Sequence, residues 1–447
     1  MEPFLQAERQ TGESKREESA APLGRWQAPA LISLADQAVF SGSMLLVNIL
    51  LARWTSPEEF GAFAVLFAVF LIFAGFHNAL IVEPMSVFGA RKDAAARQVY
   101  FRHVYLMHGA VVAVLATVAG LGVVFLGGES LRTAKWALPL VIPLAMTFWL
   151  ARRACYVESR PGRALGMSTL YAILTILGLY WLSYTGSLST FSAFMLFGLA
   201  GFTVSLPAVC KALVQRRSQS PTTIVSSIKQ HLFYGRWSLG ESIAFALSMS
   251  ILPLAIAYFM DLGETGKFRA VQILFLPLAH LLTGLGLMLL PTMSRHRVST
   301  PFEDYASRSR MILALFVGLS IAYVVPIIVF GSNLLTLIYQ DPSYLDLVSL
   351  LPYLGLSAVA GAASAAMMIV LRSSERPDLV FLSTAAGAVV MLLFGIAMIA
   401  AFGAGGVAAA LILNSGVTAI LLAWSSRSLL FQSAPAVGHR VEEGANV

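Results

Sequence analysis

The strongest constraint on this chain is a series of long apolar segments separated by polar stretches. Most of them reach the roughly 20 residues that an α-helix needs to span about 30 Å of hydrocarbon. Of the 447 residues, 57% are hydrophobic and 12% are charged, whereas soluble domains carry about 25% charged residues. We therefore expect an all-α integral membrane protein. Its twelve predicted transmembrane helices lie near residues 30–52, 60–82, 104–127, 135–151, 165–183, 190–213, 238–260, 270–292, 311–330, 348–371, 379–401 and 404–425.

Lysine and arginine are distributed unevenly over the connections between these segments. With a cytoplasmic N-terminus, all but five of the 30 basic residues fall on the cytoplasmic side. Cytoplasmic loops of membrane proteins carry such an excess, so we expect a multi-pass protein with both termini in the cytoplasm. The net charge of +7 then follows from topology, and no nucleic-acid partner is expected. The five exceptions are Arg53, Arg132, Lys135, Lys267 and Arg269.

The chain divides into two similar halves. An offset of 205 residues aligns the first half with the second, and repeats in the same orientation pack as two lobes around a central site. We expect an N-terminal six-helix lobe over 30–214, a cytoplasmic linker over 215–236 and a C-terminal six-helix lobe over 237–426, with a central cavity. Residues 1–29 form a predicted disordered cytoplasmic tail, and 427–447 a second tail. The aligned pairs are Asp36–Glu241, Ser43–Ser248, Glu59–Glu264, Gly61–Gly266 and Phe63–Phe268.

The first predicted helix carries its polar residues on one side. Asp36, Gln37, Ser41, Ser43 and Asn48 fall within a sector of roughly 160° at 100° per residue. A carboxylate near the middle of a bilayer costs about 2.5–3.5 kcal/mol on insertion scales, so it normally faces a protein or water-filled interior. Asp36 is therefore either a proton or sodium acceptor or gate contact, or a structural carboxylate paired with a basic residue in the bundle.

Asn48 and three ionisable residues in the predicted spans are further candidates for substrate binding or ion coupling. Glu241 aligns with Asp36, but it stands five residues after Arg236 and also suits a side chain that reaches the cytoplasmic interface. His77 and Glu83 lie in the inner half of the second helix. His77 either relays protons beside a carboxylate or is a hydrogen-bonded packing residue.

Arginines at cytoplasmic helix ends are candidates for capturing a pyrophosphate. Arg102 begins the third helix, and Arg152 and Arg153 end the fourth. A guanidinium matches the oxygens of a phosphate group bidentately. The positive-inside rule explains the same arginines without a ligand, so both interpretations stay open.

Small residues and prolines bear on helix packing. A row of small residues predicts a close packing face on the tenth helix rather than a site. These residues are Gly355, Ala358, Gly361, Ala362 and Ala365. Cys155 and Cys210 fall at cytoplasmic helix ends, where thiols stay reduced, so no disulfide is expected.

Four prolines lie in the predicted spans: Pro253, Pro277, Pro326 and Pro352. Because proline bends or partly unwinds a helix, we expect these helices to bend there, and bent helices can act as hinges.

Four stretches resemble the polysaccharide-export (oligosaccharide) flippases, whose superfamily also contains the multidrug and toxin extruders and the lipid II flippase. The resemblance covers most of residues 27–424. It implies a two-lobed transporter that works by alternating access in the bacterial cytoplasmic (inner) membrane. The implied cargo is an undecaprenyl-pyrophosphate-linked oligosaccharide for surface polysaccharide biosynthesis, carried to the outer leaflet, with membrane lipids, a polysaccharide polymerase and assembly proteins as further partners. The stretches are SLADQAVFSGSMLLVNILLARWTSPEEFGAFAV, HLFYGRWSLGES, FRAVQILFLPLAHLLTGLGLMLLPTMS and LIYQDPSYLDLVSLLPYLG.

Two alternatives to a lipid-linked oligosaccharide flippase stay open. One is an ion-coupled small-molecule (multidrug) exporter of the same superfamily. The other is a membrane enzyme acting on lipid-linked sugars, although the chain lacks a sizeable external loop. We do not expect an enzyme, because the sequence has no zinc-spaced His/Cys cluster, no Gly-rich phosphate loop and no Gly-x-Ser-x-Gly. No metal site and no cofactor is expected either. Transport can be coupled to protons or to sodium ions.

Overall fold

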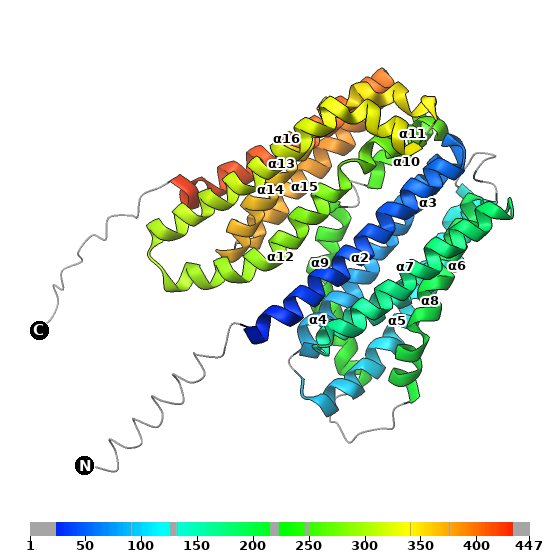
Figure 1. Ribbon diagram of the computed structural model, residues 1–447. Coiled ribbons are helices and arrows are strands. Elements are labelled where there is room, and N and C mark those ends of the chain that lie inside the picture. Colours follow the sequence, from blue (N-terminus) through cyan, green and yellow to red (C-terminus); the bar gives the residue numbers. More distant parts are fainter. Residues whose placement is uncertain are drawn as a thin grey trace, which may run out of the picture.

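The chain folds into two lobes of long helices (Figure 1). Where the structure describes the chain, it contains helices and turns and no strand. The first helix begins and the last helix ends at the same end of the bundle, which we call the terminal end; we call the other the closed end. The computed structural model describes residues 24–90, 92–125, 131, 133–214, 223–245, 250–339, 341–374 and 376–431.

The N-terminal lobe contains six membrane-length helical segments. Polar side chains fix where several of them begin: Ser56 accepts a hydrogen bond from the Glu59 amide, and Asp93 accepts one from the Ala96 amide. Such N-caps satisfy amides that the helix leaves without a partner. The segments are α2 (Gly24–Trp54), α3 (Pro57–His77) continued by a π-helical turn (Asn78–Val82) and α4 (Glu83–Ala90), α5 (Ala94–Gly122), α6 (Ala137–Val157), α7 (Pro161–Tyr184) and α8 (Thr190–Val214).

The C-terminal lobe is built from more interrupted helices. Asp261 caps α11 by accepting a hydrogen bond from the Glu264 amide, at the position that Ser56 and Glu59 occupy in the other half. The helices are α9 (Ile224–Phe245), α10 (Ile251–Phe259), α11 (Leu262–Ile273), α12 (Leu276–Ser299), α13 (Phe302–Tyr339), a 3-10 segment (Pro342–Leu350), α14 (Leu351–Ser373), α15 (Pro377–Val390), a π-helical turn (Met391–Gly395) and α16 (Ile396–Phe431).

The described residues contain nine helices long and apolar enough to cross a membrane, or ten with the bent pair α11–α12. The segment 378–430 counts once among these although it is 53 residues long. A further pair, α9 and α10, lies on either side of residues 246–249, which the structure does not describe. With that segment divided in two and this pair counted as one span, the described helices are consistent with the twelve spans that the sequence predicts. The chain is therefore a multi-pass membrane protein.

Gly403 divides the longest segment into two antiparallel helices. Its φ of 55° lies in the left-handed region that only glycine adopts readily. Contacts on either side pair residues symmetrically about this point: a Cβ at Gly395 would lie 3.3 Å from Ala410, and one at Gly387 would lie 2.2 Å from the Thr418 hydroxyl. The chain therefore reverses at Gly403 and forms the eleventh and twelfth spans.

The lobes meet at the closed end through two glycines. A Cβ at Gly61 on α3 would lie 1.7 Å from the carbonyl oxygen of Leu262, and a Cβ at Gly266 on α11 would lie 2.1 Å from that of Pro57. The two backbones can approach this closely only because neither residue has a side chain. Figure 1 shows α2 and α12 spreading apart from this junction toward the terminal end.

The helix α9 departs from the sequence expectation. The connection 215–236 is predicted to be a linker, yet it is helical from Ile224. This part of α9 packs against the N-terminal lobe: His231 hydrogen-bonds the Leu80 carbonyl at 2.9 Å and the Tyr100 hydroxyl at 2.7 Å. These buried polar contacts stabilise a helix that is too polar to be recognised as a span.

The prolines take different places. Pro277 lies in the first turn of α12, directly after the break that bends this helix by 51° against α11. Pro352 lies in the first turn of α14, after the 3-10 segment, and Pro253 lies in α10. Pro326 lies inside α13, which continues through it. Breaks therefore accompany two of the four prolines that the sequence singles out.

Candidate functional site

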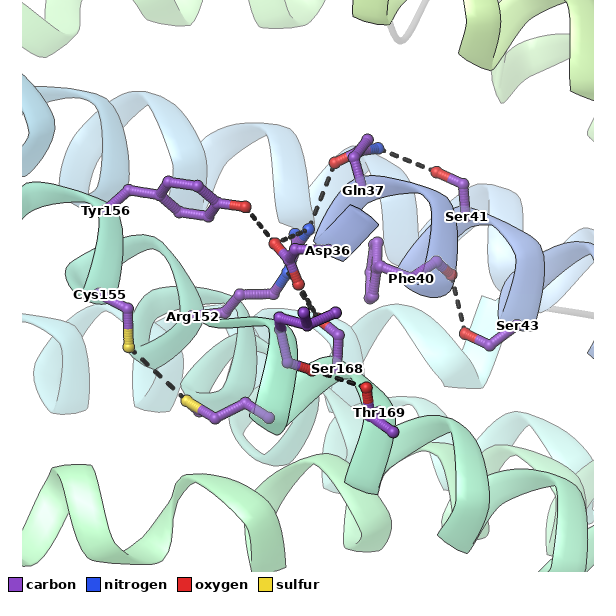
Figure 2. A network of polar contacts seen from close by, with 12 residues as sticks. Asp36, Gln37, Phe40, Ser41, Ser43, Arg152, Cys155, Tyr156, Ser168 and Thr169 are labelled. Atoms are coloured by element: carbon purple, nitrogen blue, oxygen red, sulfur yellow. Dashed lines mark hydrogen bonds and ion pairs between the residues drawn. The ribbon is translucent and has the colours of Figure 1, made fainter. Parts of the chain in front are cut away.

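Asp36 lies in a network that joins α2 to α6 and α7 (Figure 2). Its carboxylate is fully buried and accepts hydrogen bonds from the Arg152 guanidinium, at 2.7 Å and 3.2 Å, and from the hydroxyls of Tyr156 and Ser168. The same guanidinium also donates to Gln37 at 3.3 Å. The carboxylate therefore has three donor residues, all from its own lobe.

The Arg152 side chain is held from several directions. Its guanidinium carbon lies 4.4 Å from the centre of the Phe40 ring, a cation–π distance, and its Nε donates to the Ser168 hydroxyl at 2.9 Å. Only 15% of the side chain is exposed. Of the alternatives that the sequence leaves open for Asp36, this geometry matches a carboxylate paired with a basic residue inside the bundle.

Asn48 lies on the lobe interface. Its amide nitrogen donates to the Met44 carbonyl at 2.8 Å, and its oxygen accepts a hydrogen bond from Arg269 on α11 at 3.3 Å. Arg269 also donates to Gln272 at 2.7 Å. Nearby, the Tyr344 hydroxyl donates to the Ala52 carbonyl at 3.0 Å. These bonds tie α2 to the C-terminal lobe near the closed end.

His77 faces another histidine rather than a carboxylate. Its Nε2 lies 2.9 Å from Nδ1 of His108 on α5, and Nε2 of His108 lies 2.9 Å from the Thr147 hydroxyl on α6. That hydroxyl donates to the Pro143 carbonyl at 2.6 Å. Both rings are buried. The structure thus gives His77 a hydrogen-bonded packing position, and the carboxylate neighbour that a proton relay needs is not among its hydrogen-bond partners.

The two glutamates differ in what the structure describes. Glu83 begins α4, and one of its oxygens accepts a hydrogen bond from the Tyr234 hydroxyl of α9 at 3.1 Å. It thereby joins the N-terminal lobe to the start of the second half. Glu241 lies within α9, but its side chain is outside the described residues, so the proposed equivalence with Asp36 stays a prediction.

The three arginines predicted to capture a pyrophosphate are not equivalent. Arg152 is committed to Asp36. Arg153 is exposed on the next position of α6 and interacts electrostatically with Glu83. Arg102 is half-buried on α5. Their binding of a ligand stays a prediction, and by exposure Arg153 is the most accessible of the three.

Several residues of these networks are not predicted from the sequence. His108 carried a usable signal, because an ionisable residue inside an apolar span is unusual. Tyr156, Ser168 and Tyr234 carried none, since single hydroxyls in helices are common and their partners lie far away in the sequence. Ser168 and Asp36, for example, are 132 residues apart.

A groove of about 580 Å³ runs along the C-terminal lobe between α12 and α14. The small residues of α14 that are predicted to form a packing face have two different environments here. Gly355 does pack closely, since a Cβ there would lie 2.6 Å from Val324, but Gly361 has open space where a Cβ would be. Ala358, Gly361 and Ala365 line the groove. The predicted packing face is therefore confirmed at Gly355 and wrong at Gly361, where small side chains leave a groove instead of a helix contact.

The lining of this groove is mostly apolar. Among its described residues, Arg372 near the terminal end of α14 is the one charged side chain. Gln272, the partner of Arg269, lies toward the closed end. No group of three or more His, Cys, Asp or Glu side chains suited to a metal ion occurs in the part of the chain that the structure describes.

Solved structures with the same fold are membrane transporters. An inward-facing multidrug resistance MATE family transporter of the MOP superfamily matches with a TM-score of 0.71 and 16% identity, covering 90% of this chain and 98% of that one. The lipid II flippase MurJ in an inward closed conformation matches with a TM-score of 0.69 and 13% identity, covering 89% and 87%.

A third similar structure is a MOP superfamily transporter from Pyrococcus furiosus, described as having a binding pocket of reverse polarity. It matches with a TM-score of 0.65 and 15% identity, covering 90% of this chain and 96% of that one. No protein-family model and no curated protein matches the sequence. The chain therefore has the fold of the MOP superfamily transporters, with two six-helix lobes.

Proposed function

We propose that this protein is a transporter that flips an undecaprenyl-pyrophosphate-linked oligosaccharide across the membrane by alternating access. The observation that carries the proposal is the groove between α12 and α14. It offers about 580 Å³ of mostly apolar space, and Arg372 is the one charged residue among its described lining. An apolar channel with a cation near one end suits a lipid chain attached to a phosphate.

The charges of the described residues support this cargo over a cationic drug. Carboxylates that are open to a ligand favour the binding of organic cations. In the described spans, Asp36 is occupied by Arg152, Tyr156 and Ser168, and Glu83 accepts from Tyr234. A guanidinium binds phosphate oxygens with charge-assisted hydrogen bonds. The described polar groups therefore favour an anionic substrate.

The direction of transport follows from the proposed topology. We place the terminal end in the cytoplasm of a bacterium, because the basic residues concentrate there. The lobes touch through Gly61 and Gly266 at the other end. Under this placement we assign the structure to a state open toward the cytoplasm. Loading from the inner leaflet and release to the outer leaflet then require this contact to separate.

Fold similarity supports two functions. MurJ is a lipid II flippase, and the MATE structure belongs to a multidrug resistance transporter. The exporter is therefore the second candidate. Transport assays on one preparation of reconstituted protein distinguish the two functions, because a flippase translocates the lipid-linked sugar and an exporter takes up organic cations.

The test uses purified protein in proteoliposomes that contain a fluorescent undecaprenyl-pyrophosphate oligosaccharide in both leaflets. Translocation is followed by access of an added glycosidase to the sugar. We expect wild-type protein to expose the inner-leaflet pool, and Gly361→Leu to slow this at least tenfold, because the new side chain fills the groove.

Gly416→Leu is the matched control, since Gly416 also has open space around a Cβ but does not line the groove. It should translocate at the wild-type rate. Ethidium uptake without any sugar translocation would reject the flippase and support the exporter.

A further inference from the structure

A second cavity lies in the N-terminal lobe, away from the groove. This crevice measures about 440 Å³ and is lined by α5, α6, α7 and α8 near the terminal end. Its floor is buried and almost entirely apolar, and Gly166 on its wall has open space where a Cβ would be. This is the volume range of a site for a small organic molecule. The floor residues are Phe101, Tyr105, Ala151, Ala154 and Cys155.

Cations gather at the rim of this crevice around one carboxylate. Lys211, Arg163 and Arg160 lie 3.6 Å, 3.8 Å and 4.0 Å from the oxygens of Glu158. Arg163, Lys211 and Glu158 line the cavity itself. Three positive charges face one negative charge, so the rim carries an excess of positive charge among the described residues.

The cations remain available to another anion. Good hydrogen bonds from nitrogen to oxygen measure about 2.7–3.2 Å, and all three distances to Glu158 are longer. Arg163 and Lys211 are also half-exposed, at 58% and 47%. Their N–H groups can therefore donate to a phosphate without losing a hydrogen bond inside the protein.

The hydroxyl of Tyr105 is a polar group in the lining of the crevice. Tyr105 is 6% exposed and lines the cavity. Its phenolic hydroxyl is a hydrogen-bond donor. An ester carbonyl between a phosphate and an acyl chain would accept such a bond.

We propose that this crevice binds one anionic glycerophospholipid of the surrounding membrane. Its phosphate lies between Arg163 and Lys211, and one acyl chain lies along the floor. A free phosphate ion would leave the apolar floor unused, and a neutral lipid would leave the excess positive charge unused. Basic pockets between transmembrane helices are a recognised way to hold acidic headgroups.

The bound lipid lies directly behind the Asp36 network. Ala151 and Cys155 on the crevice floor are sequence neighbours of Arg152 and Tyr156, and Met167 on its wall precedes Ser168. The lipid thus packs against the parts of α6 and α7 that hydrogen-bond Asp36 on α2, and it stabilises their position. Because it binds the folded protein, it should raise the melting temperature in a concentration-dependent manner.

The experiment uses the full-length protein, purified and delipidated in detergent, and native mass spectrometry with added phosphatidylglycerol or phosphatidylcholine. We expect one phosphatidylglycerol to bind at least about tenfold more tightly than phosphatidylcholine, the equivalent of about 1.4 kcal/mol for one charge-assisted contact. Thermal melting of each sample confirms that the protein is folded.

Two variants test the two halves of the site. Arg163→Glu combined with Lys211→Glu should lower phosphatidylglycerol occupancy at least tenfold, and Gly166→Leu should block the acyl chain to a similar degree. Lys229→Glu, an exposed charge reversal on α9, is the matched control and should bind as wild type does.

Equal binding of the two lipids, or unchanged binding in both crevice variants, would overturn the proposal. The wild-type protein provides further tests that need no variant. Displacement of phosphatidylglycerol by millimolar inorganic phosphate would assign the site to a free anion. Preferential displacement by undecaprenyl phosphate would assign it to the transported carrier lipid. Failure of both competitors supports the proposal, and none of these outcomes depends on whether the protein is a flippase.

Discussion

Gly61 on α3 and Gly266 on α11 contact each other across the lobe interface in a symmetric manner. A Cβ at Gly61 would lie 3.0 Å from the Gly266 nitrogen, and a Cβ at Gly266 would lie 3.0 Å from the Gly61 nitrogen. These residues also align in the two halves of the sequence. A self-complementary contact between equivalent positions is what a two-fold axis produces, and in a duplicated chain such an axis relates the two halves.

A side chain at this junction should force the lobes apart. Gly61→Ala places a methyl group 1.7 Å from the Leu262 carbonyl oxygen, and overpacking of this kind costs about 1–3 kcal/mol. We expect a lower melting temperature and slower transport. Gly109→Ala on α5 is the control, since a Cβ there meets nothing within 4 Å. Equal melting temperatures for the two variants would show that the contact is not tight.

The ion pair between Asp36 and Arg152 should be strongly coupled. Removing one partner of a buried pair costs about 3–5 kcal/mol, because the other charge is left uncompensated. Asp36→Asn and Arg152→Gln should therefore each destabilise the protein by that amount. The double variant should lose clearly less than the sum. Chemical denaturation of all four proteins in detergent measures this, and strictly additive losses would contradict the pairing.

The polar contacts near the closed end should hold α2 against the C-terminal lobe. Asn48→Leu removes the acceptor for Arg269, and Tyr344→Phe removes the donor to the Ala52 carbonyl. We expect losses of about 1.5–3 kcal/mol for the first, which involves a charged group, and about 1 kcal/mol for the second. Both losses of stability are measured as shifts of the denaturation midpoint, provided that the dependence of the unfolding free energy on denaturant concentration is unchanged. An unchanged midpoint for Asn48→Leu would show that Asn48 does not stabilise the contact between the lobes.

Arg372 should matter for substrate affinity more than for turnover. Arg372→Gln removes the charged residue of the groove lining, and loss of a charge-assisted hydrogen bond costs about 1.5–3 kcal/mol, or roughly 10–150-fold in affinity. The half-saturating concentration of the lipid-linked sugar should rise accordingly. Arg376→Gln is the control, because Arg376 is exposed and pairs with Asp378 outside the groove. Similar kinetics for both variants would rule out a phosphate contact at Arg372.

The sequence predicts the spans and their grouping well, because membrane length and hydrophobicity act locally. It also predicts that Asp36 faces inward, since the polar residues of α2 share one side. It does not predict Arg152 as the partner, because the two residues are 116 positions apart and many arginines satisfy the positive-inside rule equally well.

Other features depend on packing that local patterns do not encode. Ile224 and its neighbours read as a polar linker, but the partners of His231 stabilise a helix there. Gly361 and Gly355 look alike in the sequence, yet one lines a groove and the other touches Val324. Whether a small residue closes or opens a space depends on the helix opposite.

Alternating closure of two lobes is the central claim, and two distances in one protein test it most directly. Spin labels at Thr185 and Asn333 report on the closed end, and labels at Gly162 and Glu303 report on the terminal end; all four residues are exposed. The labels go into a background in which Cys155 and Cys210 are replaced by alanine, and distances are measured by double electron–electron resonance during transport. We predict that the closed-end distance lengthens while the terminal-end distance shortens. Transport with both distances unchanged would contradict the account.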